Sequence, residues 1–393
     1  MSKRKKGGHF PIRVLYTTHA SNLTGASRSL LDMLSGLPKE KVEPTVLLRK
    51  HGPIEEKLKE LGVEYNVLPH IPWVNSRRGR FPDSIKRLIH AVAQPRIDRF
   101  VRDGNFDLIH SNSLLCGAGM IAAKKAAIPY ISHMRDMVEE DHDMYHINDK
   151  QLRGVVYDAK RVICISEMVA RKYNDWCRKG ACVVINDGID VSAYFDKHKA
   201  ILSGETVELL LAGRFAPGKG QIDAIQAVEL LKEKGVKAHL VLVGGVGDPA
   251  YRQRCEDYVR MHKLEEWVEI LEFTEDISSL RARADISLTC STSEAMGRVT
   301  AEGMMAGCLA VAADAGATSE ILVHGETGYL YEVGCPEALA HCVESALEQR
   351  EESRRIASEG QLWSCSHFDV KAYGSQIIDL YLDCLSEDGW PVV

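Results

Sequence analysis

The stretch from residue 284 to residue 330 constrains the fold more than any other part of the chain. It begins with a short apolar strand, ADISLTC, followed by a polar turn from Ser291 to Ser293, an Ala/Met-rich helix that stops at Gly307, and a second strand, CLAVAAD. Apolar strands separated by helical patterns indicate parallel βαβ units. In open sheets of such units, ligands bind at the carboxyl ends of the strands. The pattern therefore predicts an α/β protein with a ligand site near this turn.

Two carboxylates, Glu294 and Glu302, flank the start of that helix. A helix turns by about 100° per residue, so the eight-residue spacing rotates them roughly 80° apart and they need not meet. Gly297 and Arg298 lie at or near the helix N-terminus, where unpaired N–H groups attract anions. If Glu294 is still in the loop, Glu294 and Glu302 can bind two different parts of one elongated ligand. The alternative is that Glu294 is only a helix cap and Glu302 only a solvated helix residue.

Length and composition indicate a soluble protein of two domains. The chain has 393 residues, of which 45% are hydrophobic and 26% charged, and its net charge of -6 argues against general nucleic-acid binding. No apolar run approaches the roughly 18 residues that span a bilayer, and no secretory apolar region follows the basic first residues, so we expect a cytoplasmic protein. The 11 cysteines show no Cys-x2-Cys pair. We therefore expect reduced thiols and no zinc site.

Glu294, Glu302 and the sequences that follow them, AGCLAVA, GATSEI and HGETGYL, resemble the retaining glycosyltransferases of family 4, the group 1 set with the GT-B fold. Leu309 stands where that family usually has proline, and Ala317 where it often has a second glycine. Neither departure removes a charged side chain. The resemblance implies two Rossmann-like, doubly wound α/β domains with a cleft between them, here expected at residues 1–200 and 201–365, and a crossover helix at 366–393 that returns to the first domain.

Two further motifs carry the same resemblance. Strand ELLLAGRF and the following APGKG resemble the family's Gly-Arg-x4-Lys-Gly, and INDGID at 185–190 resembles its linker signature. The resemblance implies that Arg214 and Lys219 hold the donor diphosphate. Two cations can stabilise the charge that develops on a leaving nucleoside diphosphate, so neither a metal nor any cofactor beyond the donor is expected.

The resemblance also implies roles for the remaining candidate residues. Glu302 would bind the ribose hydroxyls, Glu294 the sugar hydroxyls, and His133 would lie beside the donor sugar. The other predicted donor contacts are Gly25 in a loop before the first helix, Gly245 in a Val-Gly-x-Gly-like turn, the backbone at Phe273 and Thr274 near the base, and Gly297, Arg298 and Val299 along the phosphates. No side chain stands out as a nucleophile, so front-face transfer assisted by the leaving phosphate is the expected route to retention.

A basic segment in the first half allows two interpretations. Between residues 76 and 102 the chain has eight basic residues, Arg77, Arg78, Arg80, Lys86, Arg87, Arg96, Arg99 and Arg102, against two aspartates. Part of it has helical spacing, which indicates a surface helix with a solvated basic face. Alternatively, it is a peripheral patch for anionic lipid or a lipid-phosphate acceptor, with each basic residue contributing about 1 kcal/mol. The second interpretation allows peripheral contact with the inner face of the membrane.

Competing motifs leave several alternatives open. Gly245-x-Gly247-x-x-Ala250 follows a strand, which would suit an NAD-dependent oxidoreductase. Gly213 to Gly220 nearly spells a P-loop but lacks the hydroxyl that holds Mg²⁺. His142 and His146 have metal-ligand spacing without a third ligand, so no metal is expected. Other possibilities are a nucleotide-sugar epimerase or a phosphorylase of the same fold, although we identify no pyridoxal lysine, or an inactive sugar-nucleotide binding module.

The interpretation that joins most of these observations is a retaining, metal-independent glycosyltransferase of the hexosyltransferase type. Its donor would be a UDP- or GDP-type sugar and its acceptor a saccharide, a lipid-linked molecule or a small molecule, as in polysaccharide biosynthesis. The sequence does not separate these donors and acceptors.

Overall fold

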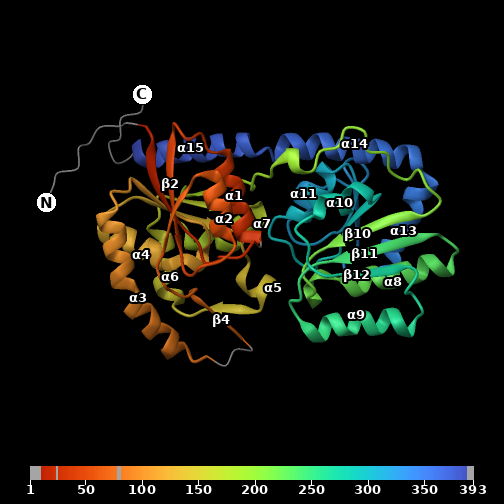
Figure 1. Cartoon of the computed structure of the whole chain (residues 1–393), viewed down its shortest axis with the longest axis horizontal. Helices are drawn as coiled ribbons and strands as arrows, with labels where there is room; N and C mark the ends of the chain where they lie inside the picture. Colours follow the sequence, from red (N-terminus) through yellow and green to blue (C-terminus); the bar gives the residue numbers. More distant parts are fainter. Residues whose placement is uncertain (1–9, 24, 78–80, 387–393) are drawn as a thin grey trace. The chain divides into compact units, whose positions relative to one another are not determined.

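The computed structural model describes residues 10–23, 25–77 and 81–386, except for the side chains of residues 141 and 142. These residues form two compact units (Figure 1). Unit 1 contains the chain up to Ile189 and the segment from Val370 onward, and unit 2 contains Asp190–Asp369. The signature INDGID is divided between them, and its Asp187 belongs to unit 1 because it pairs there with Arg135.

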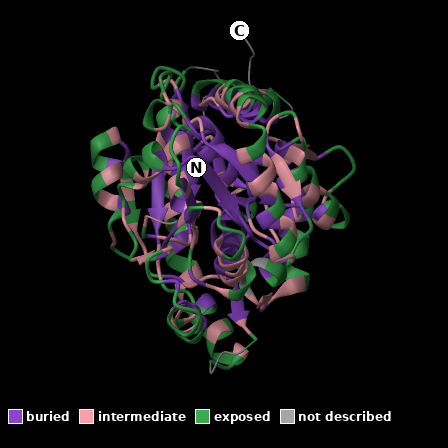
Figure 2. Ribbon diagram, turned by 90° about the vertical axis from the view of Figure 1, so that its right-hand side faces the viewer, coloured by how far each residue is buried: buried purple, intermediate pink, exposed green. Residues whose placement is uncertain are grey.

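Unit 1 is built on a seven-stranded parallel sheet with the order β3-β2-β1-β5-β6-β8-β9. Its strands are β1 (Ile12–Thr17), β2 (Val42–Leu48), β3 (Glu64–Val67), β5 (Leu108–Ser111), β6 (Tyr130–Met134), β8 (Arg161–Cys164) and β9 (Cys182–Val184). The central strands β5 and β6 are buried at every position. Near-continuous burial is typical of parallel strands whose two faces are both covered by helices, and Figure 2 shows these buried strands inside more exposed helices.

All the helices of unit 1 except the C-terminal one lie between two of its strands in the sequence. They are α1 (Gly25–Gly36), α2 (Ile54–Leu61), α3 (Asp83–Asp103), α4 (Gly117–Ala126), α5 (Val138–His142), α6 (Asp149–Tyr157), α7 (Glu167–Tyr173) and α15 (Val370–Ser386). A small antiparallel pair, β4 (Val74–Ser76) with β7 (Met144–His146), lies outside the main sheet.

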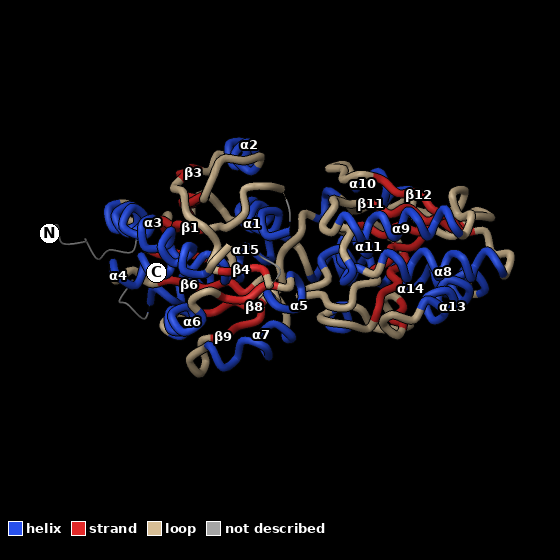
Figure 3. Tube along the Cα trace, turned by 90° about the horizontal axis from the view of Figure 1, so that it is seen from below, coloured by secondary structure: helices blue, strands red, loops and turns tan. Residues whose placement is uncertain are grey.

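Unit 2 repeats this architecture with six parallel strands in the order β12-β11-β10-β13-β14-β15. The strands are β10 (Val207–Ala212), β11 (Ala238–Val243), β12 (Val268–Leu271), β13 (Ile286–Thr289), β14 (Leu309–Ala313) and β15 (Tyr329–Tyr331). The helices are α8 (Gln221–Glu233), α9 (Pro249–Met261), α10 (Ile277–Arg283), α11 (Arg298–Met305), α12 (Thr318–Ile321), α13 (Pro336–Glu348) and α14 (Arg350–His367). Figure 3 shows helices on both sides of the strands in each unit.

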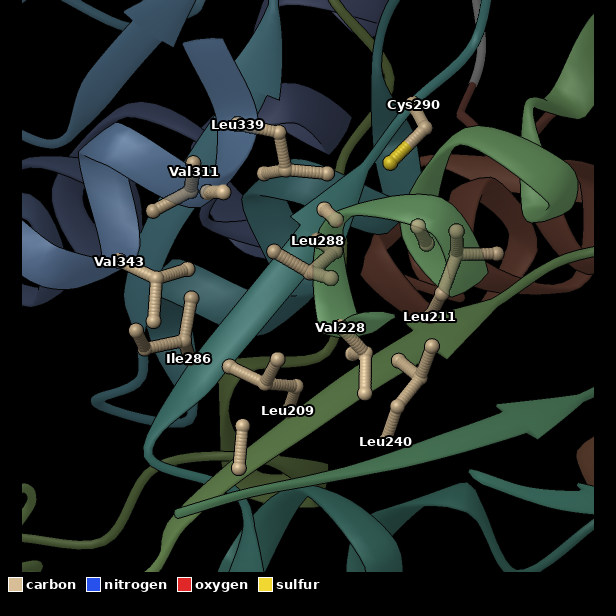
Figure 4. Packing of buried hydrophobic residues seen from close by; sticks show 14 of the residues in the cluster. Leu209, Leu211, Val228, Leu240, Ile286, Leu288, Cys290, Val311, Leu339 and Val343 are labelled. Atoms are coloured by element: carbon tan, nitrogen blue, oxygen red, sulfur yellow. The ribbon is translucent and has the colours of Figure 1, made fainter. Parts of the chain in front are cut away.

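The core of unit 2 lies between its sheet and the helices α8 and α13 (Figure 4). Leu209 and Leu211 on β10 and Ile286 on β13 meet Val228 of α8 and Val343 of α13, and all five are buried. Alternate positions of these strands face this layer, as the two-residue period of a strand requires. This packing fixes where the loops after β10 and β13 emerge.

Both sheets reverse their strand order at one point. In unit 1 the chain moves outward from β1 to β3 and then returns to pair β5 with β1, and in unit 2 β13 pairs with β10 in the same way. This 3-2-1-4-5-6 order is that of the Rossmann fold, in which ligands bind at the carboxyl ends of the strands beside the reversal. The predicted doubly wound α/β fold of the GT-B type is confirmed.

Helix α15 completes unit 1 from the distant end of the chain. It crosses α1 at Gly36 and Gly374, where an added Cβ on Gly374 would lie 2.2 Å from the Gly36 carbonyl oxygen. Farther along, the hydroxyl of Tyr381 donates to that of Tyr16 on β1 at 2.8 Å, and both side chains are buried. Unit 1 therefore has a core that its first 189 residues cannot close alone.

Candidate active site

The reversal of strand order in unit 2 brings Lys219 and Glu294 together. Lys219 lies in the loop after β10 and Glu294 in the loop after β13, and their Nζ and Oε1 atoms are 2.6 Å apart. Ser291 donates its hydroxyl to the same carboxylate oxygen at 2.6 Å. The Glu294 side chain is only 14% exposed, against 32% for Lys219. The charge pair is therefore mostly screened from solvent, yet the lysine remains accessible to a ligand.

Two glycines with positive φ shape these loops. Gly220 has φ 66°, and an added Cβ would lie 2.1 Å from the Cys290 carbonyl oxygen. Gly316 also has φ 66°, and its added Cβ would lie 2.3 Å from the backbone nitrogen of Glu294. The carbonyl oxygen of Glu294 accepts from the backbone N–H of Ala317 at 2.7 Å. The turn at Gly316 thus holds the backbone of Glu294 in place.

Arg214 lies in the same loop as Lys219 and is exposed. Its aliphatic carbons cover Gly247, where an added Cβ would lie 2.7 Å from Cδ of Arg214. Gln221 donates to the Arg214 carbonyl oxygen at 3.0 Å. The predicted Gly245 lies in the neighbouring loop, where its carbonyl oxygen accepts from Phe215 N–H at 2.9 Å. The loops after β10 and β11 are therefore joined beneath an accessible guanidinium group.

Helix α11 begins directly after the Glu294 loop. Gly297 precedes it with φ 83°, so Arg298 and Val299 form its first turn. Glu302 is buried, and its two carboxylate oxygens lie 2.8 Å from Nε of Arg298 and 2.6 Å from Nη2 of Arg281. A carboxylate has about four lone-pair positions, so it can accept from more than two donors at once. The solvated helix position considered as an alternative for Glu302 is wrong, because the side chain is enclosed.

Arg281 is a residue that the sequence interpretation missed. It lies on α10, is 1% exposed, and its guanidinium carbon is 5.0 Å from the ring centre of Tyr194. Within the described part of the chain, its Nε and Nη1 atoms have no hydrogen-bond partner. The segment ISSLRAR contains two arginines with nothing to distinguish the buried Arg281 from the exposed Arg283. Only the fold shows that one of them neutralises Glu302.

Phe273 and Thr274 follow β12, so they lie at the same sheet edge as the two charged loops. The Phe273 side chain is 52% exposed, and the Thr274 hydroxyl accepts from Asp276 N–H at 3.1 Å. An exposed aromatic ring and accessible backbone at this edge are compatible with the predicted contact to a nucleobase.

The glycine-rich turn after β11 does not fit a dinucleotide site. It follows the second strand of the unit, whereas the Rossmann fingerprint follows the first. The side chain of Asp248 accepts from the N–H groups of Ala250 and Tyr251 at 3.0 and 3.1 Å. A carboxylate therefore occupies the N-terminus of α9, where an NAD pyrophosphate would bind. The NAD-dependent oxidoreductase is not favoured.

In unit 1, His133 is part of a buried polar network. Its Nδ1 lies 3.1 Å from Nε2 of His110 and 3.2 Å from Nη2 of Arg135, and His110 Nδ1 lies 2.7 Å from the Tyr381 hydroxyl. Burial, with the Arg135 charge as a second cause, lowers the pKa of His133 and lowers that of His110 to about 3. Both rings are therefore neutral at pH 7. His133 Nε2 has no hydrogen-bond partner among the described residues, and it would have to be uncovered to contact a ligand.

The other predicted positions in unit 1 are less constrained. Gly25 opens α1 with nothing within 4 Å of an added Cβ, which leaves room for close approach. Its neighbour Thr24 lies outside the described residues, as do Arg78 and Arg80. His146 stacks edge-on against Trp176 at 5.4 Å, and the side chains of Asp141 and His142 are not described. Among the side chains that are described, no three His, Cys, Asp or Glu residues are grouped to hold a metal ion.

Two parallel sheets of Rossmann order, with paired charges where the second reverses, define an α/β protein of the GT-B class. Two family models match it in succession: "Glycosyltransferase Family 4" over residues 23–193 and "Glycosyl transferases group 1" over residues 195–363. The chain belongs to this glycosyltransferase family and is a transferase. The predicted family and enzyme class are confirmed.

Known relatives are similar over much of the chain. D-inositol 3-phosphate glycosyltransferase of Streptosporangium roseum is 22% identical over 80% of this chain and 78% of the relative. N-acetyl-alpha-D-glucosaminyl L-malate synthase of Bacillus anthracis is 27% identical over 51% and 53%. The crystal structure of Anabaena Alr3699/HepE in complex with UDP and glucose is similar with a TM-score of 0.80 and 24% identity, covering 94% of this chain and 99% of that one.

Proposed function

We propose that this protein transfers a sugar from a UDP- or GDP-type nucleotide-diphosphate sugar to a saccharide, lipid-linked or small-molecule acceptor, with retention of configuration and without a metal. The observation that carries the proposal is the pairing of Lys219 with Glu294 at the strand reversal of unit 2. A cation and a carboxylate in contact can separate to meet a ligand that carries both phosphates and hydroxyl groups.

The positively charged groups of unit 2 would stabilise the leaving group. As the glycosidic bond breaks, negative charge develops on the nucleoside diphosphate, and fixed positive groups stabilise it most where water is excluded. Lys219, the exposed Arg214 and the N-terminus of α11 at Gly297 to Val299 are the groups available in unit 2. They could provide the charge that a metal provides elsewhere.

The carboxylates orient the donor. Glu294, once released by Lys219, would accept from the sugar hydroxyls, and Glu302 would accept from the ribose hydroxyls. Phe273 and Thr274 would lie along the base. The roles of Gly25 and His133 remain predictions from the family resemblance. Because the family resemblance implies no side-chain nucleophile, front-face attack assisted by the leaving phosphate is the proposed route to retention.

The donor base and the location of the protein are also proposals. The similar structure of Anabaena Alr3699/HepE holds UDP and glucose, which supports a UDP-type donor here. Among the described residues no helix is both long and apolar enough to cross a bilayer. We propose a cytoplasmic enzyme that uses saccharide or lipid-linked acceptors in polysaccharide synthesis.

A thermal-shift screen tests the donor. UDP, GDP, ADP, their common sugars and NAD are added to the wild type, to Lys219→Ala and to Lys237→Ala, whose lysine pairs with Glu205 on the exposed surface of unit 2. A ligand at a hundred times its Kd stabilises the folded state by about 2.7 kcal/mol. One nucleoside diphosphate should raise the Tm of the wild type and Lys237→Ala, but not of Lys219→Ala.

The remaining parts of the proposal need a product assay. NMR of the product should show the anomeric configuration of the donor, and EDTA should leave the rate unchanged. Inversion would exclude the front-face route, and loss of activity in EDTA would exclude metal independence. Stabilisation by NAD alone, equal in all three proteins, would overturn the transferase proposal.

A further inference from the structure

Helix α3 buries only one of its faces. His90, Ile97 and Val101 point inward, and the ring centre of His90 lies 5.2 Å from that of Trp73. On the same side Gln94 donates to the Ala118 carbonyl oxygen of α4 at 2.9 Å. Figure 1 shows α3 beside α4 on the flank of unit 1. The contacts to α4 and Trp73 cover only the inward face of the helix, so they leave its opposite face without a partner among these elements.

The opposite face of α3 is apolar and exposed. We call it the outer face, and it consists of Phe81 just before the helix and Ile85, Leu88, Ile89 and Val92 within it. Their exposed fractions run from 36% for Ile89 to 70% for Val92. At about 100° per residue, Ile85, Leu88 and Val92 fall within a sector of roughly 60°. Contiguous exposed apolar side chains of this kind mark an interaction site more often than scattered ones do.

Basic residues continue this face toward the C-terminus of the helix. At about 100° per residue, Arg99 falls in the same sector and Arg96 about 20° beyond it. Both are exposed, and within the described part of the chain neither is in an ion pair. The other basic side chains of α3 are engaged: Lys86 donates to the Val74 carbonyl oxygen at 2.8 Å and Arg87 to that of Ile147 at 3.0 Å. Among the basic residues of α3, two arginines beside the apolar stripe therefore remain available for an external partner.

An apolar stripe flanked by unpaired arginines fits the interface of an anionic lipid bilayer. Such a helix lies in the plane of the surface, with its apolar side chains among the acyl chains and its cations near the lipid phosphates. The only acidic residues of α3 are Asp83, Asp98 and Asp103. Asp83 accepts from Asn75, Asp98 pairs with Lys125, and Asp103 pairs with Arg102. Asp98 and Asp103 are thus compensated by cations, whereas Asp83, at the start of the helix, is hydrogen-bonded to a neutral amide and keeps its charge.

We propose that the outer face of α3 docks unit 1 on an anionic membrane surface. This inference does not rest on the proposed transferase activity, since it is measured without donor or acceptor. It would bring the enzyme to the surface where lipid-linked acceptors reside.

Vesicle co-sedimentation tests the proposal. The full chain is mixed with vesicles of phosphatidylcholine and phosphatidylglycerol, or of phosphatidylcholine alone. We expect binding to the mixed vesicles, weakened about tenfold by each of Leu88→Gln and Val92→Gln, because each removes a partly inserted apolar side chain. Arg96→Gln and Arg99→Gln should each weaken it about fivefold, and on the neutral vesicles they should have no effect.

The matched control is Leu362→Gln, since Leu362 is 60% exposed on a helix of unit 2, against 64% for Leu88. Its vesicle binding should equal that of the wild type, and thermal unfolding should show all variants folded. Absence of binding by the wild type would overturn the proposal. So would equal binding by Leu88→Gln and Leu362→Gln, or a concentration-dependent dimer in gel filtration that Leu88→Gln alone abolishes, because the outer face would then bind a second copy.

Discussion

The guanidinium group of Arg281 lies 2.6 Å from Oε2 of Glu302, and both side chains are buried. A hydrogen bond to a charged group contributes about 1.5–3 kcal/mol. Arg281→Met removes this contact while Arg298 still compensates Glu302, so it should lower the free energy of unfolding by about that amount in urea titrations. Arg283→Met, on the exposed side of the same helix, should change it by less than about 0.5 kcal/mol.

The same substitution has a second readout. With Arg281 absent, Glu302 loses the contact at Oε2, and its carboxylate can turn toward Arg298, which lies 2.8 Å from Oε1. If Glu302 binds ribose hydroxyls, Arg281→Met should raise the Kd for the nucleoside diphosphate at a temperature where the variant is fully folded. An unchanged Kd would show that Arg281 stabilises α10 and α11 without positioning Glu302.

Glu294→Gln tests the carboxylate of the charge pair. The amide keeps the size of the side chain but loses the charge that faces Lys219 and the hydrogen bond accepted from Ser291 in its present form. A hydrogen bond to a charged group contributes about 1.5–3 kcal/mol, so kcat/KM for the nucleotide sugar should fall about 10- to 100-fold. The Kd for the nucleoside diphosphate alone should change little, because it lacks the sugar. The exposed Glu265→Gln is the control.

Gly316→Ala tests the turn that holds Glu294. The substitution strains the backbone at φ 66° by about 1–2 kcal/mol, and its Cβ would collide with the backbone nitrogen of Glu294. Gly235→Ala introduces the same strain at φ 73° with nothing within 4 Å. Gly235→Ala should lose only the stability that this strain costs, and Gly316→Ala should lose more because of the collision. Only Gly316→Ala should lose transfer activity, by about 100-fold if Glu294 moves by an ångström. Equal activity in the two variants would argue against a role for Glu294.

The buried histidines of unit 1 make stability depend on pH. His110 is neutral in the folded state because burial lowers its pKa from 6.5 to about 3, and His133 is shifted in the same direction. The unfolded chain takes up these protons below pH 6.5, so each histidine lowers the free energy of unfolding by roughly 1.4 kcal/mol per pH unit as the pH falls below that value. Urea titrations at pH 7, 6 and 5 should show this slope, reduced in His110→Gln and unchanged in the exposed His341→Gln. An identical slope in His110→Gln would show that this ring is not the source.

The parallel sheets could be predicted because their strands carry their own signal. Strands such as CLAVAAD are apolar at nearly every position, and they alternate with helical patterns, so only a sheet covered on both faces suits them. The contact between Lys219 and Glu294 could be expected only from the family resemblance, because the residues are 75 positions apart. No local spacing encodes which loops meet at a strand reversal.

The missed features depend on long-range packing. Arg281 and Arg283 look alike in sequence, and only the position of α11 makes one of them the partner of Glu302. The helical period of residues 83–103 was recognisable, but which face is buried depends on α4 and Trp73. His110 was not a candidate because its partners, His133 and Tyr381, come from a neighbouring strand and from the last helix.

The return of α15 to unit 1 has a consequence for synthesis on the ribosome. Unit 2 consists of one uninterrupted segment, Asp190–Asp369, whereas unit 1 lacks α15 until the segment from Val370 has emerged. Domains that fold during translation usually do so in sequence order, the first one first. In this chain, unit 2 lies after most of unit 1 in the sequence, but all the residues of unit 2 have been synthesised before α15 completes unit 1. The hydroxyl of Tyr16 and the ring of His110, which Tyr381 contacts in the folded protein, stay uncovered until α15 has been synthesised. We therefore expect unit 2 to be able to complete its fold before unit 1, whose core is closed only when α15 packs against it.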